Sequence, residues 1–177
     1  PSFVGALASA RSLARLDLED NGAITSVGWT ALTNILQHPN SSLTHLLLYI
    51  YVQNQNINDE VAISFANALI NNKRLKTLDF GLINNLSVTA RGWAALANVL
   101  CNKSSLESIY NSNHTLTNVG WGDIPHDLAP YLRMNENDNK HEVARQKILK
   151  HHFANGDKNI EKFVEMELAI IPSAIAW

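Results

Sequence analysis

A chain of 177 residues, of which 46% are hydrophobic, is long enough to bury the core of one ordinary domain. Its formal net charge is −2 and its lysines and arginines are scattered, so the sequence offers no basic field for nucleic acid. A single cysteine, Cys101, excludes an internal disulfide and a zinc site built on several thiolates. No apolar run reaches the roughly 20 residues of a membrane span. No secretory signal is visible, and we expect a cytoplasmic protein without a membrane span.

Four short apolar stretches with the strand spacing LxxLxL recur along the chain. They begin near Leu13, Leu43, Leu75 and Leu106, and successive starts are separated by 30, 32 and 31 residues. Each stretch is followed by asparagines and then by apolar residues at helical spacing. This regular return predicts strand–loop–helix units that stack and share one core. The asparagines of these turns are Asn21, Asn54, Asn56, Asn84, Asn85, Asn111 and Asn113, and we expect them to form a ladder of hydrogen bonds.

The N-terminal segment, residues 3–13, has the pattern of the end of one more helix. Leu7 precedes Leu13 by the same offset that separates Leu100 from Leu106. The chain therefore begins inside a unit, and no polar residues cap this end as they normally cap a terminal repeat. We expect the chain to be the C-terminal part of a longer array, with further repeats or domains N-terminal to it in the same protein.

The helical parts of the units carry the more specific motif. Asn56–Leu69 reads NINDEVAISFANAL and closely matches NxIxDEGAxALAxxL, with Val61 in place of the usual glycine. Together with LxxLxLxxN, this motif resembles the ribonuclease-inhibitor-like class of the leucine-rich repeat family over roughly residues 3–132. The resemblance implies an α/β solenoid with parallel strands on its concave face and helices on its convex face. Trp29, Trp93 and Trp121, which open three helices, are expected to pack between units.

The end of the chain departs from this pattern. Asn111 occupies a core place in the fourth unit, and Pro125 and Pro130 interrupt its helix. We therefore expect repeats in residues 1–132, followed by a polar loop and a helical C-terminal cap in residues 133–177. The alternative is that these helices dock on a partner helix. Apolar residues at helical spacing predict one helix at Val143, Ile148, Leu149 and Phe153, and another at Ile160, Phe163, Val164 and Leu168.

No group of residues has the spacing of a catalytic, metal or cofactor site. His141, His151 and His152 are not completed by an acid or a cysteine, and the eight glycines are dispersed rather than gathered in a phosphate-binding loop. Cys101 lies beside a helical stripe and is more typical of a small buried apolar residue than of a nucleophile. We therefore expect no enzymatic activity, no metal and no cofactor.

The surface that can be predicted is the outward face of the strands. Successive strand residues point to opposite faces, so burying the leucines exposes the residues between them. Tyrosines among acidic residues there would form a mixed patch, and tyrosine is enriched at protein-binding hot spots. The alternative is an ordinary solvated face. The predicted protein-binding residues are Arg15, Asp17, Glu19, His45, Leu47, Tyr49, Thr77, Asp79, Ser108 and Tyr110, with Gly81 and Ser112 completing the exposed columns.

These observations predict a noncatalytic scaffold that binds another protein on its concave face. The alternative is a sensor or autoinhibitory repeat region of a larger intracellular receptor or small-GTPase regulator, which the open N-terminal end favours. Fold analogy alone cannot name the partner.

Overall fold

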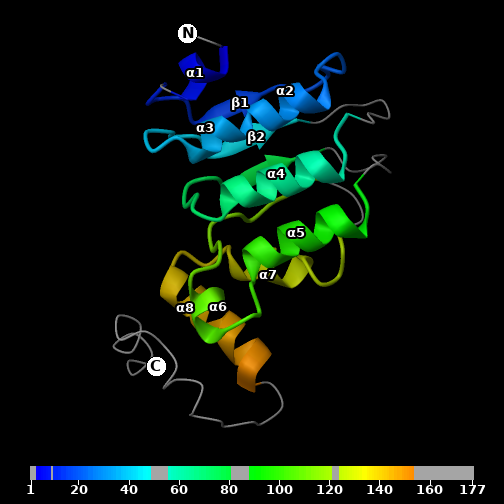
Figure 1. Cartoon of the computed structure of the whole chain (residues 1–177). Helices are drawn as coiled ribbons and strands as arrows, with labels where there is room; N and C mark the ends of the chain where they lie inside the picture. The colour runs from blue at the N-terminus through cyan, green and yellow to red at the C-terminus, as the bar shows by residue number, and fades with distance from the viewer. Residues whose placement is uncertain (1–2, 9, 49–55, 81–87, 121–123, 154–177) are drawn as a thin grey trace.

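The computed structural model describes residues 3–8, 10–48, 56–80, 88–120 and 124–153. Short strands alternate with helices in the first half, and the second half is helical. Figure 1 shows the units in rows from the N-terminal end, with α6 and α8 at the opposite end of the molecule. In chain order the elements are α1 (Phe3–Ala8), β1 (Arg15–Asp17), α2 (Ser26–Ala31), α3 (Thr33–Gln37), β2 (His45–Leu47), α4 (Asp59–Leu69), β3 (Thr77–Asp79), α5 (Ala90–Leu100), α6 (Leu106–Tyr110), α7 (Ala129–Met134), α8 (Lys140–Ile148) and the π-helical turn η2 (Leu149–Phe153).

The strands β1, β2 and β3 form one parallel sheet in the order β1-β2-β3. Their middle residues Leu16, Leu46 and Leu78 lie opposite one another and are 9%, 0% and 0% exposed. The residues on either side of each leucine point to the other face, because side chains alternate along a strand. For these three units, the spacing of the leucines and the register of the sheet agree.

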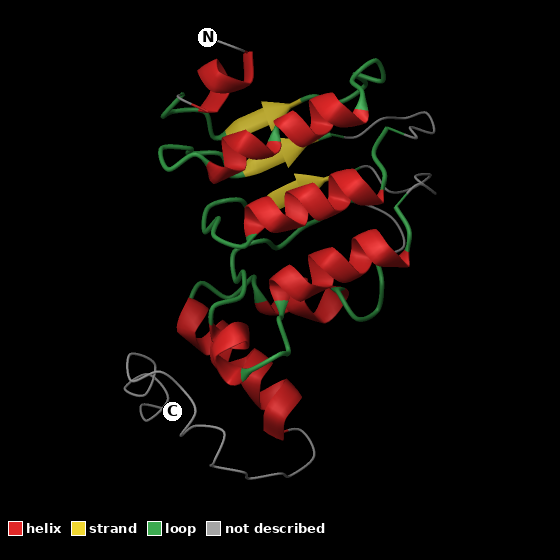
Figure 2. Ribbon diagram, in the orientation of Figure 1, coloured by secondary structure: helices red, strands yellow, loops and turns green. Residues whose placement is uncertain are grey.

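The helices form successive rows, with α2 and α3 end to end in the first, α4 in the next and α5 beyond it (Figure 1 and Figure 2). The start of α4 is set locally, because the side chain of Asn58 accepts a hydrogen bond from the Val61 amide at 3.2 Å. Phe65 of α4 meets Phe80, which follows β3, edge to face with ring centroids 5.5 Å apart. Trp29 of α2 is 0% exposed in the same core. Trp93 of α5 packs against that core partly buried, while Trp121 lies outside the described residues.

Asp59 joins α4 to α5. Its carboxylate accepts hydrogen bonds from the Thr89 amide at 2.7 Å, the Thr89 hydroxyl at 2.7 Å and the Gly92 amide at 3.1 Å. These bonds, above all the one from the Thr89 hydroxyl, hold the pKa of Asp59 below its ordinary value. A Cβ atom at Gly92 would stand 2.7 Å from Oδ1 of Asp59, so the close approach of the two helices requires glycine.

The fourth unit is not where the spacing of the leucines predicts it. The predicted strand at Leu106 is the helix α6, which Ser105 caps by accepting a hydrogen bond from the Ser108 amide at 3.0 Å. The residue that meets β3 is Asn118, which pairs with Thr77 in an isolated parallel bridge. The fourth unit therefore starts at Leu116, at an offset of 116 − 75 = 41 residues from the third, because the chain inserts α6 before it.

The predicted leucine-rich-repeat solenoid with a helical cap is accordingly wrong. The described residues form an open three-stranded parallel sheet, extended by a single bridge, with helices over the sheet and at its end. Each strand has only three residues. The regular return that would continue the array is broken by α6, and the residues after the bridge turn into α7 and α8.

A ladder of asparagine side chains ties the units together where the helices return to the strands. The amide of Asn113 donates to the carbonyl oxygens of Leu69 at 2.9 Å and of Asn72 at 2.7 Å. The amide of Asn135 donates in turn to the carbonyl oxygens of Asn113 at 3.2 Å and of Leu116 at 2.7 Å. The sequence pattern singles out Asn113 for a ladder, but not Asn72 or Asn135, which lie outside the predicted turns.

Helix α8 packs its apolar side against the preceding units. Val143, Ala144 and Ile148 are 0%, 2% and 0% exposed, whereas Leu149, where η2 begins, is 40% exposed. The helix predicted between Val143 and Phe153 thus spans α8 and η2, and the helix predicted further on lies outside the described residues. No helix in the described ranges is long and apolar enough to span a membrane.

Replacing Gly120 by alanine is expected to destabilise the fold by about 1–3 kcal/mol. Gly120 has φ = +105°, a conformation that side chains rarely adopt, and an added Cβ would lie 2.3 Å from Oδ1 of Asp79. Urea denaturation of Gly120→Ala measures the change. Gly22→Ala is the matched control, because a Cβ at Gly22 meets no atom within 4 Å. Equal midpoints for the two variants would contradict the expected strain.

Candidate protein-binding surface

The outward side of the sheet presents two columns of side chains. Arg15, His45 and Thr77 lie opposite one another at the start of the strands. At their end, Asp17 and Asp79 lie on either side of Leu47. Arg15 and Asp17 are exposed, while His45, Thr77 and Asp79 are half-buried. These columns give the sheet a polar face, with its cation at one end of β1 and its carboxylates at the other.

The charged residues of β1 are accessible to a partner. Nη2 of Arg15 lies 3.4 Å from Oδ2 of Asp17, and their side chains are 58% and 46% exposed. Such an exposed ion pair stabilises the fold by less than about 1 kcal/mol, because water screens it. Both groups can therefore exchange this contact for one with a partner at little cost to the fold.

Three carboxylates gather at the end of the strands. Partial burial raises the pKa of Glu19, and the negative charges of Asp17 and Asp79 raise it further. The Glu19 backbone amide donates to Oδ1 of Asp17 at 3.1 Å, which holds these two residues together. Among the described residues, no group of three or more histidine, cysteine, aspartate or glutamate side chains could hold a metal ion. The arrangement instead suits a cationic group of a partner.

The structure assembles only part of the predicted surface. Leu47 lies in the second column between Asp17 and Asp79, but it is 6% exposed rather than open to solvent. Ser108 and Tyr110 belong to α6, so they do not continue the columns of the sheet, and Ser112 is 6% exposed. Tyr49 and Gly81 lie outside the described residues. The acidic residues of the predicted patch, Asp17, Glu19 and Asp79, lie together. Tyr110 lies on α6 and does not join them.

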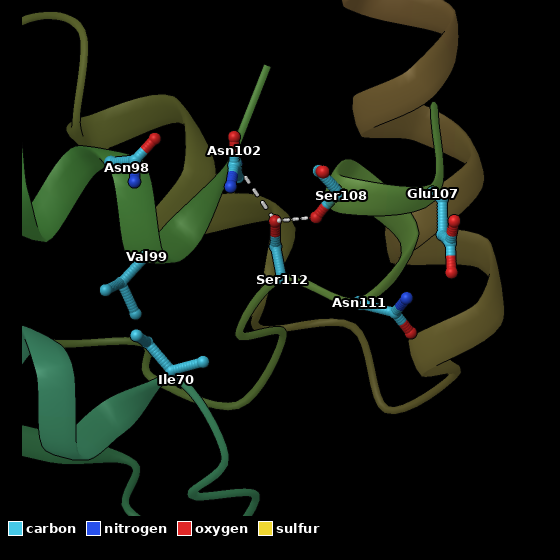
Figure 3. Close-up of a pocket in the computed structure, with 8 residues that line it drawn as sticks. All are labelled: Ile70, Asn98, Val99, Asn102, Glu107, Ser108, Asn111 and Ser112. Carbon is cyan, nitrogen blue, oxygen red and sulfur yellow. Dashed lines mark hydrogen bonds between the residues drawn. The ribbon is translucent and has the colours of Figure 1, made fainter. Parts of the chain in front are cut away.

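A pocket of about 300 Å³ lies between α5 and α6 (Figure 3). Its polar wall is held by Ser112, whose Oγ accepts from the Asn102 amide at 2.9 Å and donates to the Ser108 carbonyl at 2.8 Å. Glu107 is the ionisable residue among those that line it. Because Oγ of Ser112 already has both partners on the backbone and no histidine lines the pocket, these residues do not form a nucleophile and its base.

Sequence reasoning missed a buried cation beneath α8. Lys147 is 0% exposed, and its Nζ lies 2.7 Å from the Leu100 carbonyl oxygen, 3.1 Å from that of Asn113 and 3.0 Å from Nδ1 of His114. Burial lowers the pKa of Lys147 to about 7. Its place four residues after the buried Val143 was a signal for this position, since both fall on one helical face. Its distant partners could not be found from the sequence.

Cys101 lies near this cluster and is 2% exposed. Burial raises the pKa of its thiol, so the unreactive protonated form is favoured.

None of the family models or curated proteins compared with the sequence matches it. Among solved structures, the chain is similar to leiomodin-1 actin-binding site 2, with 17% sequence identity and a TM-score of 0.50. The similarity covers 88% of this chain and 99% of the leiomodin chain. It indicates a shared fold, and it does not support the family that the repeat pattern predicted.

Proposed function

We propose that the chain is a noncatalytic module that binds another protein on the outward face of its sheet. The observation that carries the proposal is the placement of Arg15 and Asp17 on β1 and of Asp79 on β3, in register across β2 on one face of the sheet. Side chains on paired strands keep fixed spacings, so this face presents its charges in a constant pattern. A rigid polar face of this kind confers specificity on a protein partner of complementary charge.

Two further observations support a binding role rather than catalysis. The carboxylates of Asp17, Glu19 and Asp79 raise the local negative potential without forming a metal site in the described residues. In the pocket between α5 and α6, the hydroxyl of Ser112 bonds to two backbone groups, and the hydroxyl of Ser108 accepts from that of Ser105. The protein of similar fold is named for a site that binds actin, so actin is the first partner to test.

Arg15→Ala is expected to weaken partner binding at least fivefold, because it removes the only cation on this face of the described strands, which would pair with a carboxylate of the partner. The matched control is Arg91→Ala. Arg91 pairs with Glu60 on the helical face with side chains 64% and 68% exposed, a salt bridge that is more exposed than that of Arg15 and Asp17. Binding of the fluorescently labelled chain to monomeric actin, measured by microscale thermophoresis at two salt concentrations, checks the prediction.

Equal affinities of the two variants would contradict binding through the sheet face. If wild type does not bind actin, actin is excluded, and the same pair of variants is then compared on the proteins that the wild-type chain captures. A regulatory role inside a larger receptor or small-GTPase regulator stays a prediction that the full reading frame would test.

A further inference from the structure

A second pocket, of about 430 Å³, lies where the last unit of the sheet meets α8. Its charged rim consists of Lys73, Lys76, Lys140 and Asp138, and Tyr110 and Ala144 contribute to its wall. Counting the three lysines and the aspartate gives a charge of 3 − 1 = +2. A pocket of this volume is in the range of small-molecule sites.

Two of the three lysines, Lys73 and Lys140, are held by hydrogen bonds to the backbone. Nζ of Lys73 donates to the carbonyl oxygens of Asn111 at 3.3 Å and of Ser112 at 3.1 Å. Nζ of Lys140 donates to two carbonyl oxygens at 2.8 Å each. These bonds place the ammonium groups without neutralising them, because every acceptor is an uncharged carbonyl. No described carboxylate forms a salt bridge with any of the three lysines.

The positive charge of this pocket is electrostatically unfavourable as it stands. Lys140 occupies the first turn of α8, where the helix dipole is already positive and favours anions. Burial lowers the pKa of Lys140, and the charge of Lys76 lowers it further, whereas Asp138 raises it. Burial also lowers the pKa of Lys73. An anion in the pocket would stabilise the charged forms of Lys140 and Lys73 and would offset the repulsion between Lys76 and Lys140.

The apolar walls of the pocket and the charge of its rim indicate which class of anion fits. The Tyr110 ring is fixed by a hydrogen bond of 3.2 Å between its hydroxyl and Nδ1 of His141. Together with Ala144 and the methylene stems of the lysines, it offers apolar surface beside the ammonium groups. A phosphate monoester carries about −1.5 to −2 charges at pH 7, which matches the charge of the rim better than a single carboxylate does.

We propose that this pocket binds a phosphate monoester carried on an aromatic or other apolar body. The ammonium groups of Lys76, Lys73 and Lys140 neutralise the phosphate, and Tyr110 packs against the body. This site is separate from the sheet face and does not depend on the proposed protein-binding function.

Titration of the whole chain with phenyl phosphate, followed by isothermal titration calorimetry at low salt, tests the proposal. We expect saturable 1:1 binding, and about tenfold weaker binding to Lys76→Gln, because one charged contact is lost. Lys76 is the better position to replace, because Lys140 also donates hydrogen bonds to two backbone carbonyl oxygens and its loss could disturb the fold. Lys150→Gln is the control at an exposed lysine that does not line the pocket. Circular dichroism confirms that each variant is folded.

Three comparisons decide the outcome. Phenol is expected to bind at least tenfold more weakly than phenyl phosphate, and inorganic phosphate more weakly than the ester. Absence of saturable binding, equal binding of phenol, or unchanged affinity of Lys76→Gln would each overturn the proposal. If a phosphotyrosine peptide binds more tightly than phenyl phosphate, the natural ligand of the pocket is a phosphorylated residue of a protein partner. If the peptide binds equally or more weakly, the natural ligand is a free small molecule.

Discussion

Lowering the pH from 6.5 to 4 is expected to reduce the free energy of unfolding by about 3 kcal/mol through His114. Burial, and after it the positive charge of Lys147, lowers the pKa of His114 from 6.5 to about 3. Between these pH values the unfolded chain binds a proton at this histidine and the folded chain does not. The contribution is therefore fully present above pH 6.5 and is lost as the pH falls toward 3.

The geometry explains why His114 resists protonation. Its Nδ1 lies 3.0 Å from Nζ of Lys147, and its Nε2 lies 2.9 Å from the carbonyl oxygen of Tyr110. The neutral ring can accept from Lys147 and donate to Tyr110, whereas a protonated ring would turn a second N–H toward the ammonium group. The ring is 8% exposed, so water cannot replace these partners.

Urea denaturation at pH 7 and pH 4 measures the effect in wild type and in His114→Gln. Glutamine can accept from Lys147 and donate to Tyr110, but it does not titrate, so the variant should lose less stability between the two pH values. His126→Gln, at an exposed position, is the matched control. The same loss of stability in His114→Gln and in wild type would show that other groups cause the acid sensitivity.

Asn113→Ala is expected to destabilise the protein by about 3–5 kcal/mol, the largest effect of any single substitution considered. The Asn113 side chain is 0% exposed and joins two units. Its Oδ1 accepts from the amides of Thr115 and Leu116 at 2.9 Å each, and its Nδ2 donates to two carbonyl oxygens at the end of the second unit. Alanine would leave three buried backbone groups without a partner, the amides of Thr115 and Leu116 and the carbonyl oxygen of Asn72, and would open a small cavity; the Leu69 carbonyl oxygen keeps the Asn72 amide at 3.2 Å.

Thermal and urea denaturation of Asn113→Ala check this result. Asn34→Ala, on the exposed side of α3, is the control and should change stability by less than about 0.5 kcal/mol. Asn72→Ala should also be strongly destabilising, because its Oδ1 accepts from the Arg74 and Leu75 amides and its Nδ2 donates to the Leu36 carbonyl oxygen. If Asn113→Ala behaved like Asn34→Ala, the ladder would not hold the units together.

Most of the sheet could be predicted because its signal is local. The leucines recur at offsets of 30 and 32 residues, and hydrophobic burial alone sets them opposite one another as Leu16, Leu46 and Leu78. The same alternation predicted which of their neighbours point outward, as for Arg15 and Asp17. Leu47 follows the same rule, but it is 6% exposed, which the alternation alone does not predict.

The fourth unit could not be predicted from spacing, because two segments compete for it. Leu106 and Ile109 satisfy the start of the strand pattern, but they are also three residues apart on one face of a helix. The structure buries both in α6 and gives the place beside β3 to Asn118. A signal was present in the asparagine three residues before the leucine that opens the third and the fourth unit, Asn72 before Leu75 and Asn113 before Leu116.

The sequence by itself determined the spacing of the first three strands and the helices between them, because periodic hydrophobicity and helix caps act within a few residues. Only the tertiary structure decided the burial of Lys147 beside His114, and it alone brought Lys73 and Lys76 to the same pocket as Lys140. The reason is that a buried or crowded charge is defined by its partners. Those of Lys147 lie 47 and 34 residues away along the chain, at Leu100 and Asn113.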